Sequence, residues 1–122
     1  MRDRDFEELV EKGLAEVPAR FRRRLRNVVF VVEDEPPRPG LLGLYQGRPL
    51  TTRSVSQPIA EPDRITIYQG PHERMTRTAS ELQRAVAETV WHEVGHYFGM
   101  DERQVRAAER KRTRRPGTRS ET

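Results

Sequence analysis

The chain has 122 residues, the size of one domain with a single modest core. It contains no cysteine, which excludes disulfides, thiolate zinc sites and iron–sulfur clusters, so any bound metal must use His, Asp or Glu. The N-terminus has no apolar signal core and no apolar run is long enough to cross a membrane, so we expect a cytoplasmic protein without a membrane partner.

The positive net charge of +4 comes from the C-terminal segment. Residues 103–122 hold eight Lys or Arg and two Asp or Glu, a net charge of +6, which leaves residues 1–102 with a net charge of −2. Such a segment is more often a solvated helix end and tail than a nucleic-acid arm. We assign residues 1–112 to a single domain and expect residues 113–122 to form a basic, disordered tail.

The first predicted element is an amphipathic helix that ends near Pro18. Its apolar residues recur at three- and four-residue spacing, opposite a charged face: Phe6, Leu9, Val10, Leu14 and Val17. Phe21 and Leu25 then lie four residues apart within an arginine-rich run. This spacing predicts a short second helical piece whose arginine stems cover apolar surface.

Strand patterns follow in the middle of the chain. Residues 28–32 are β-branched and apolar on both faces, which predicts a strand buried within a sheet. Residues 41–50 predict a strand, a turn at Gly47 and a returning strand. In residues 64–69 polar residues alternate with β-branched or aromatic ones, which predicts a strand near the sheet edge. His72 follows in a polar loop, where we expect it to be solvated.

A capped helix carries the main chemical motif. Thr78-x-x-Glu81 or Ser80-x-x-Gln83 supplies a capping box at its start, and Gly99 can adopt the left-handed conformation that ends it. An apolar stripe on this helix predicts its core-facing side: Val86, Val90, Trp91, Val94 and Phe98. His92 and His96 project from the opposite side.

His92, Glu93 and His96 form the pattern His-Glu-x-x-His. The four-residue spacing puts the two imidazoles one helical turn apart on the same face, where both can bind one zinc ion. Glu93 lies beside this pair rather than on the metal, where its carboxylate can take a proton from an activated water. The pattern therefore predicts His92 and His96 as metal ligands and Glu93 as the catalytic base.

A catalytic zinc site of this type needs a third protein ligand. Gly99 stands at the glycine of the longer pattern His-Glu-x-x-His-x-x-Gly-x-x-His, and Glu102 stands at the third ligand position of that pattern. Carboxylate oxygen binds zinc, so Glu102 is the first choice and Asp101 the second. Glu109 ranks behind both, because a ligand on a following helix needs a longer gap. Tyr45 and Tyr68 are candidates to stabilise an oxyanion, although Tyr at strand ends more often packs.

Three segments together resemble the short bacterial zincin-like metallopeptidases, which are described as possibly zinc-dependent: residues 41–47, 62–68 and 92–99. The resemblance implies an α+β domain with a minimal zincin-like fold. In it a small mixed β-sheet packs against the His-Glu-x-x-His helix, with an N-terminal amphipathic helix and a short C-terminal helix. It also implies His92 and His96 as ligands and Glu93 as base. In that family an acidic residue, commonly Asp, usually occupies the position of Glu102.

The sequence thus predicts a metallopeptidase with one Zn²⁺ ion that acts as a monomer on a peptide or protein substrate. We expect an extended peptide to add as a strand along the free edge of the strand at residues 64–69, beside Ile65, Thr66, Ile67 and Tyr68. The alternative is a non-catalytic metal-binding or partner-binding module. Its specific version contacts nucleic acid through the basic C-terminal segment, a partner that we rank second.

Overall fold

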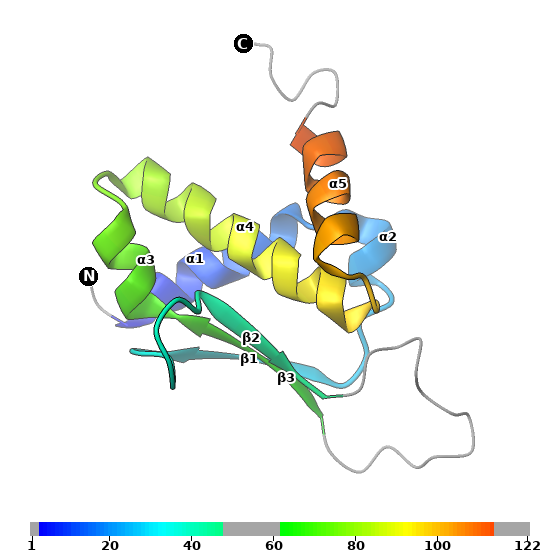
Figure 1. Cartoon of the computed structure of the whole chain (residues 1–122), viewed down its shortest axis with the longest axis horizontal. Coiled ribbons are helices and arrows are strands. Elements are labelled where there is room, and N and C mark those ends of the chain that lie inside the picture. The colour runs from blue at the N-terminus through cyan, green and yellow to red at the C-terminus, as the bar shows by residue number, and fades with distance from the viewer. Residues whose placement is uncertain (1–2, 48–61, 114–122) are drawn as a thin grey trace.

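Five helices and three strands form the part of the chain that the computed structural model describes, residues 3–47 and 62–113 (Figure 1). In chain order they are α1 (Asp3–Glu16), α2 (Ala19–Arg22), β1 (Val28–Glu33), β2 (Gly43–Gln46), β3 (Asp63–Tyr68), α3 (Gln69–Met75), α4 (Ala79–Tyr97) and α5 (Glu102–Thr113). The α+β class is confirmed. The predicted returning strand after Gly47 and the basic tail after residue 113 lie outside the described residues. Among the described helices, none has the length and apolarity needed to cross a membrane.

The sheet has the strand order β1-β3-β2. β1 runs parallel to β3, with Val28 opposite Asp63, and β2 runs antiparallel to β3, with Gly43 opposite Ile67. The central strand is therefore β3, and the prediction that it lies near an edge is wrong. Because both sides of its backbone are paired, β3 offers no free edge to a substrate, and the proposed peptide strand beside Ile65, Thr66, Ile67 and Tyr68 is wrong with it.

β1 is an edge strand, which corrects the prediction that it is buried within the sheet. Val28, Phe30 and Val32 pack against the core from one face, whereas Val29, on the other face, is 41% exposed. A half-buried strand normally alternates apolar and polar residues. This alternation is absent from the sequence of β1 because its outer face also carries valine.

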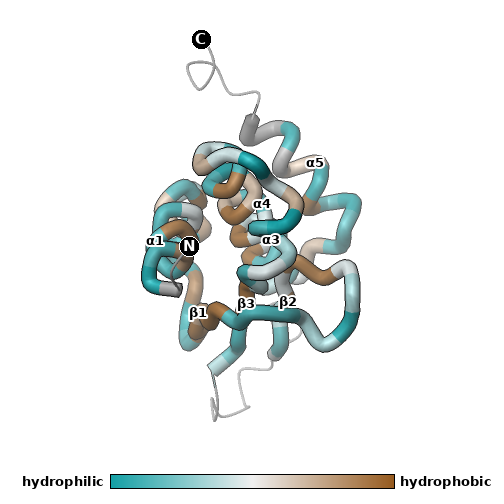
Figure 2. The backbone as a smooth tube through the Cα atoms, turned by 90° about the vertical axis from the view of Figure 1, so that its left-hand side faces the viewer, coloured by the Kyte–Doolittle hydropathy of each residue, from teal (hydrophilic) through white to brown (hydrophobic). Residues whose placement is uncertain are grey.

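The core lies between the sheet and the two long helices α1 and α4, which cover the same face of the sheet (Figure 1). Figure 2 shows hydrophobic segments gathering where α4, α1 and the strands meet, with hydrophilic segments on the outer turns. All three layers contribute fully buried aliphatic or phenyl side chains, among them Phe6, Ile65, Ile67, Val86, Val90 and Val94. The predicted apolar stripe of α4 therefore does face the core, and it leaves the opposite side of α4 for the histidines.

Residues 69–75 form helix α3 where the sequence pattern predicts a loop. Pro71 is the third residue of this helix, in the first turn, where its missing N–H costs no helical hydrogen bond. The helix is fixed to the end of β1, since the Gly70 N–H donates to the carbonyl oxygen of Asp34 at 2.8 Å. Arg74 also makes two hydrogen bonds to the Glu35 carboxylate, of 2.8 and 3.0 Å. α3 thereby leads the chain from the central strand to the start of α4.

Candidate metal and catalytic site

The helix that carries the histidines begins with a capping box. The Thr78 hydroxyl accepts a hydrogen bond from the Glu81 N–H at 3.1 Å, which satisfies a donor of the first turn. The Glu81 carboxylate in turn accepts a hydrogen bond from the Arg77 N–H at 2.8 Å. Of the two helix starts that the sequence offers, the cap at Thr78 is formed, with Glu81 bonded to the N–H of Arg77 in place of that of Thr78, and α4 begins at Ala79.

The other end of α4 is closed by a Schellman turn at Gly99. This glycine has a φ of 82°, a left-handed conformation that residues with a Cβ rarely adopt. The Gly99 N–H donates to the carbonyl of His96 at 2.9 Å, and the Met100 N–H donates to that of Gly95 at 3.0 Å. The predicted helix end is confirmed, and the turn directs the chain back toward the helix that it has just left.

A second capping box, at Asp101 and Gln104, starts α5 directly after this turn. The Asp101 carboxylate accepts from the Gln104 N–H at 2.8 Å, and the Gln104 side chain accepts from the Asp101 N–H at 2.9 Å. The new helix docks on α4 through Val105, which packs so closely on Gly95 that a Cβ there would lie 2.7 Å from a Val105 methyl. Asp101 is thus engaged in capping, and Glu102 becomes the first residue of α5.

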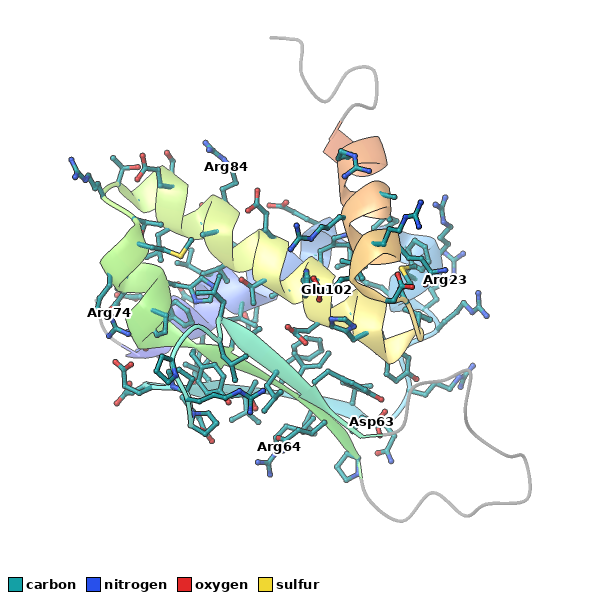
Figure 3. All side chains as sticks on the ribbon, in the orientation of Figure 1. Arg23, Asp63, Arg64, Arg74, Arg84 and Glu102 are labelled. Atoms are coloured by element: carbon teal, nitrogen blue, oxygen red, sulfur yellow. The ribbon has the colours of Figure 1, made fainter. Side chains whose placement is uncertain are left out.

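The structure brings three of the predicted site residues together. Oε1 of Glu102 lies 2.7 Å from Nε2 of His92 and 3.1 Å from Nε2 of His96. The three residues form a group whose ligand atoms all lie within 4.8 Å of one another. In Figure 3 the Glu102 side chain lies at the foot of α5, against α4. Asp101, the second choice, is held at the cap, and Glu109, the third, lies on α5 seven residues farther along the chain.

The donor chemistry of this group fits a zinc ion. Nδ1 of His96 lies 3.1 Å from the Met100 carbonyl oxygen, which only accepts hydrogen bonds, so Nδ1 carries a proton and Nε2, 3.1 Å from Glu102, is the nitrogen left to bind a metal. Either a proton or a metal cation can lie between these nitrogens and the Glu102 oxygen. Two imidazole nitrogens and one carboxylate oxygen are a known three-residue set for catalytic zinc, and the carbonyl is a typical orienting partner.

The charge state of Glu102 suits this group. Its side chain is 56% exposed, and the burial that it does have opposes ionisation. The hydrogen bonds and charges of His92 and His96 outweigh that effect and lower the pKa of the Glu102 carboxyl. Arg106, one turn along α5, places its guanidinium 3.7 Å from the other carboxylate oxygen. Glu102 therefore faces the histidines as a carboxylate.

Glu93 lies beside the histidines but in a different environment. It is only 7% exposed, and burial raises the pKa of its carboxyl, an effect that the charges of His96 and His92 partly oppose. The backbone of Tyr45, on β2, makes a hydrogen bond to this carboxyl. Glu93 is thus held against the edge strand at the wall of the cleft, next to the three converging side chains and not among them.

The cleft lies between β2 and α4 and has a volume of about 740 Å³. The Tyr68 N–H donates to the Leu42 carbonyl at 3.0 Å, so the alternation of an antiparallel pair turns the backbone N–H and C=O of Gly43 and Tyr45 away from β3. Strand and helix approach closely here, since a Cβ on Gly43 would lie 2.8 Å from a Thr89 methyl and 3.1 Å from Glu93 Cγ.

The two tyrosines considered for an oxyanion role have other surroundings. The Tyr45 hydroxyl donates to the Asp63 carboxylate at 2.7 Å, although other atoms of Tyr45 line the cleft. Tyr68 is 3% exposed and is not among the residues that line the cleft. Its burial, together with the charges of Glu33 and Glu93, raises the pKa of its hydroxyl. Neither hydroxyl is therefore our choice for contacting a substrate carbonyl.

His72 is fully buried, which corrects the prediction that it is solvated. Its Nδ1 lies 2.6 Å from the Tyr68 carbonyl oxygen and its Nε2 lies 2.8 Å from the Thr89 hydroxyl. Burial lowers the pKa of the ring, although the bond to Tyr68 partly opposes this. Burial thus favours the neutral form of His72, whose Nε2 contacts the Thr89 hydroxyl one turn before Glu93, and that hydroxyl also lies 3.1 Å from the Ala85 carbonyl oxygen. The three-residue spacing of Gln69 and His72 is the feature of the sequence that indicates this burial, since both residues lie on the buried side of α3.

Comparison with known families agrees with this geometry. A family model described as zincin-like metallopeptidase matches residues 25–112, more than half of the chain. The match spans all three strands, the His-Glu-x-x-His helix and nearly all of α5. No curated protein matches the chain at a significant level. The small mixed sheet, the helix with paired histidines and the family match together establish that the chain belongs to the zincin-like metallopeptidase family.

Proposed function

We propose that the protein is a zinc-dependent peptidase in which His92, His96 and Glu102 hold one zinc ion and Glu93 is the general base. The observation that supports this most directly is the convergence of two imidazole Nε2 atoms on one oxygen of Glu102, at the wall of a cleft that also contains the buried Glu93. A zinc ion held by this set supplies Lewis acidity, which activates water and polarises a peptide carbonyl.

Glu93 takes the proton from the attacking water and passes it to the leaving amine. A buried carboxyl with a raised pKa suits the first of these two steps, because the carboxylate of a weaker acid is a stronger base. The proton that it takes up is then held on Glu93 until the leaving amine, a far stronger base than the carboxylate, accepts it. The backbone of Tyr45 and the two histidines keep its ionised form accessible. His96 keeps its orientation through the Met100 carbonyl.

The substrate in this proposal is a peptide that adds to β2 and not to β3. Among the described strands β2 lies at an edge of the sheet, where it forms a wall of the cleft, and the N–H and C=O of Gly43 point outward in the direction that strand addition requires. An extended peptide in this position lies between β2 and α4 and passes Glu93 and the histidines. The strand that binds the peptide in this proposal is therefore β2, at residues 43–46, and not the strand at residues 64–69 that the sequence suggests.

The test combines metal analysis with cleavage of a mixed peptide library. Zinc should be present near one equivalent, be lost in His96→Ala, and be retained in Glu93→Gln. The wild-type protein should cut peptides, whereas Glu93→Gln should lose at least about a hundredfold in rate, the lower range for a general base. Zinc binding without any cleavage by the wild-type protein would instead support the non-catalytic metal-binding module. Cleavage that Glu93→Gln leaves unchanged would remove Glu93 from the mechanism.

A further inference from the structure

The cleft continues beyond the catalytic residues toward the N-terminal end of α4, and its lining there is apolar. Leu41 and Leu42, which lead into β2, form one wall, while Ala85 on α4 and Met75 at the end of α3 complete this part. Toward the histidines the same cleft is lined by charged side chains, Glu102 and Arg106, and Glu88 lies between the two ends, three residues after Ala85 and four before His92. One end of the cleft therefore suits an apolar side chain of a bound peptide, and the other end suits a polar or charged one.

Met75 is the most exposed residue of this apolar end. It is 57% exposed, and the only other exposed large hydrophobic residue in the described part of the chain is Val29, on the far edge of the sheet. A single exposed apolar side chain on a convex surface is ordinary, but Met75 lines a concave site. Methionine is unbranched and flexible, and it adapts to apolar ligands of different shape.

The distance between the two ends can be stated in residues of a bound peptide. Ala85 precedes His92 by seven residues of one helix, which is about 10 Å along its axis. An extended chain advances about 3.3 Å per residue, so this distance corresponds to about three residues. The strand β2 gives the same direction, since Gly43 packs on Thr89 and Glu93 while Leu41 and Leu42 precede it along the cleft.

We propose that Leu41, Leu42, Met75 and Ala85 form a subsite for a large apolar side chain of the peptide substrate, about three residues from the cleaved bond. The inference rests on the proposed peptidase function and names the substrate class of that site. The occupant is a substrate side chain because the apolar end and the catalytic residues share one continuous cleft. Burial of that side chain covers the part of Met75 that is exposed in the free protein.

The test uses zinc-loaded full-length protein and pairs of peptides that differ only in Leu or Asp at one position, three residues to either side of the cleaved bond. The wild-type protein should cut one Leu peptide with a kcat/KM about tenfold or more above that of its Asp partner. Met75→Glu should abolish this preference. Val29→Glu places the same charge on the other exposed hydrophobic residue, outside the cleft, and should keep it.

A binding measurement separates failure of the subsite from failure of the peptidase proposal. Glu93→Gln should bind the same Leu peptide about tenfold more tightly than the Asp peptide, and adding Met75→Glu should remove the difference. If zinc-loaded protein cuts nothing but this binding preference is found, the peptidase proposal falls and the apolar subsite stands. Cleavage or binding without a Leu preference, or a preference that survives Met75→Glu, overturns the subsite.

Discussion

His96 hydrogen-bonds through Nδ1 to the carbonyl oxygen of Met100, 3.1 Å away, across the turn that ends its own helix. The residue that makes this contact possible is Gly99, whose φ of 82° lets the chain reverse directly after α4. The same reversal brings Glu102 to within 3.1 Å of Nε2 on the same ring. The turn at Gly99 therefore both orients His96 and places Glu102 next to it.

Gly99→Ala should weaken zinc binding as well as stability. An alanine in the left-handed conformation costs about 1–2 kcal/mol, and relaxation of the turn would displace the Met100 carbonyl from His96. Loss of such an orienting partner typically costs about 10–100-fold in metal affinity, which competition with a chelator measures. Gly40→Ala is the matched control, because Gly40 also has a positive φ, 92°, and has open space around its Cβ position. Equal zinc affinities in the two variants would contradict the role of the turn.

The choice between the three candidate carboxylates can be tested by single substitutions. Glu102→Gln should lower zinc affinity by more than about 100-fold, because the proposal makes Glu102 a ligand and not merely a partner of one. Asp101→Asn should leave zinc affinity unchanged, since asparagine also caps a helix. Glu109→Gln should likewise have no effect. The affinities are measured by competition with a chelator, and a larger loss in Asp101→Asn than in Glu102→Gln would reassign the third ligand.

The parts of the site that the sequence predicts correctly are those encoded within a few residues. The spacing of His92 and His96, the Thr78 cap and the turn at Gly99 each follow from local backbone geometry, and the structure contains all three arrangements. The position of Glu102 follows from the turn together with the cap at Asp101 and the contact of Val105 with Gly95, which hold the start of α5 against α4.

The errors concern relationships between distant segments. The order of strands in a sheet cannot be deduced from the residues of one strand. The sequence predicts β1 at the centre and β3 near an edge, the reverse of the observed order, because valine occupies both faces of β1. His72 was misplaced because Gly70 and Pro71 suggest a break in a helix of only seven residues. Its environment also depends on Thr89, seventeen residues later in the chain. The substrate-facing edge of β2 depends in the same way on its pairing with β3.

Gly43→Ala should reduce catalysis while leaving zinc binding intact. The added methyl group would lie 2.8 Å from Cγ2 of Thr89, so β2 would have to move away from α4, and the backbone contact between Tyr45 and Glu93 would weaken. Overpacking of this kind typically costs about 1–3 kcal/mol in unfolding free energy. The measurements are kcat on a cleaved peptide, zinc content and the unfolding midpoint.

Thr89→Ser provides the corresponding rescue, because serine lacks Cγ2 but keeps the hydroxyl that faces His72. The double variant Gly43→Ala with Thr89→Ser should recover a large part of the lost stability and rate, although contacts of 3.1 Å to Glu93 and 3.2 Å to the Thr66 carbonyl remain. A double variant whose losses equal the sum of the two single variants would show that the methyl contact is not the cause.

The buried His72 should make the fold sensitive to acid. Burial lowers the pKa of its ring below the ordinary value of 6.5, so in the interval between these two pKa values the unfolded chain binds more protons than the folded one. The stability due to the neutral ring is therefore complete above about pH 6.5 and declines as the pH falls toward the folded pKa, with a slope of at most about 1.4 kcal/mol per pH unit.

Denaturant unfolding between pH 5 and pH 8, in the presence of a chelator so that zinc does not contribute, measures this slope. His72→Gln should be less stable than the wild-type protein at pH 8, because glutamine fills the space poorly and satisfies Thr89 and the Tyr68 carbonyl less well. Its stability should nevertheless fall less steeply below pH 6.5, since the group whose pKa is lowered by folding has been removed. Parallel curves for the two proteins would show that the slope comes from another group and that folding does not lower the pKa of His72.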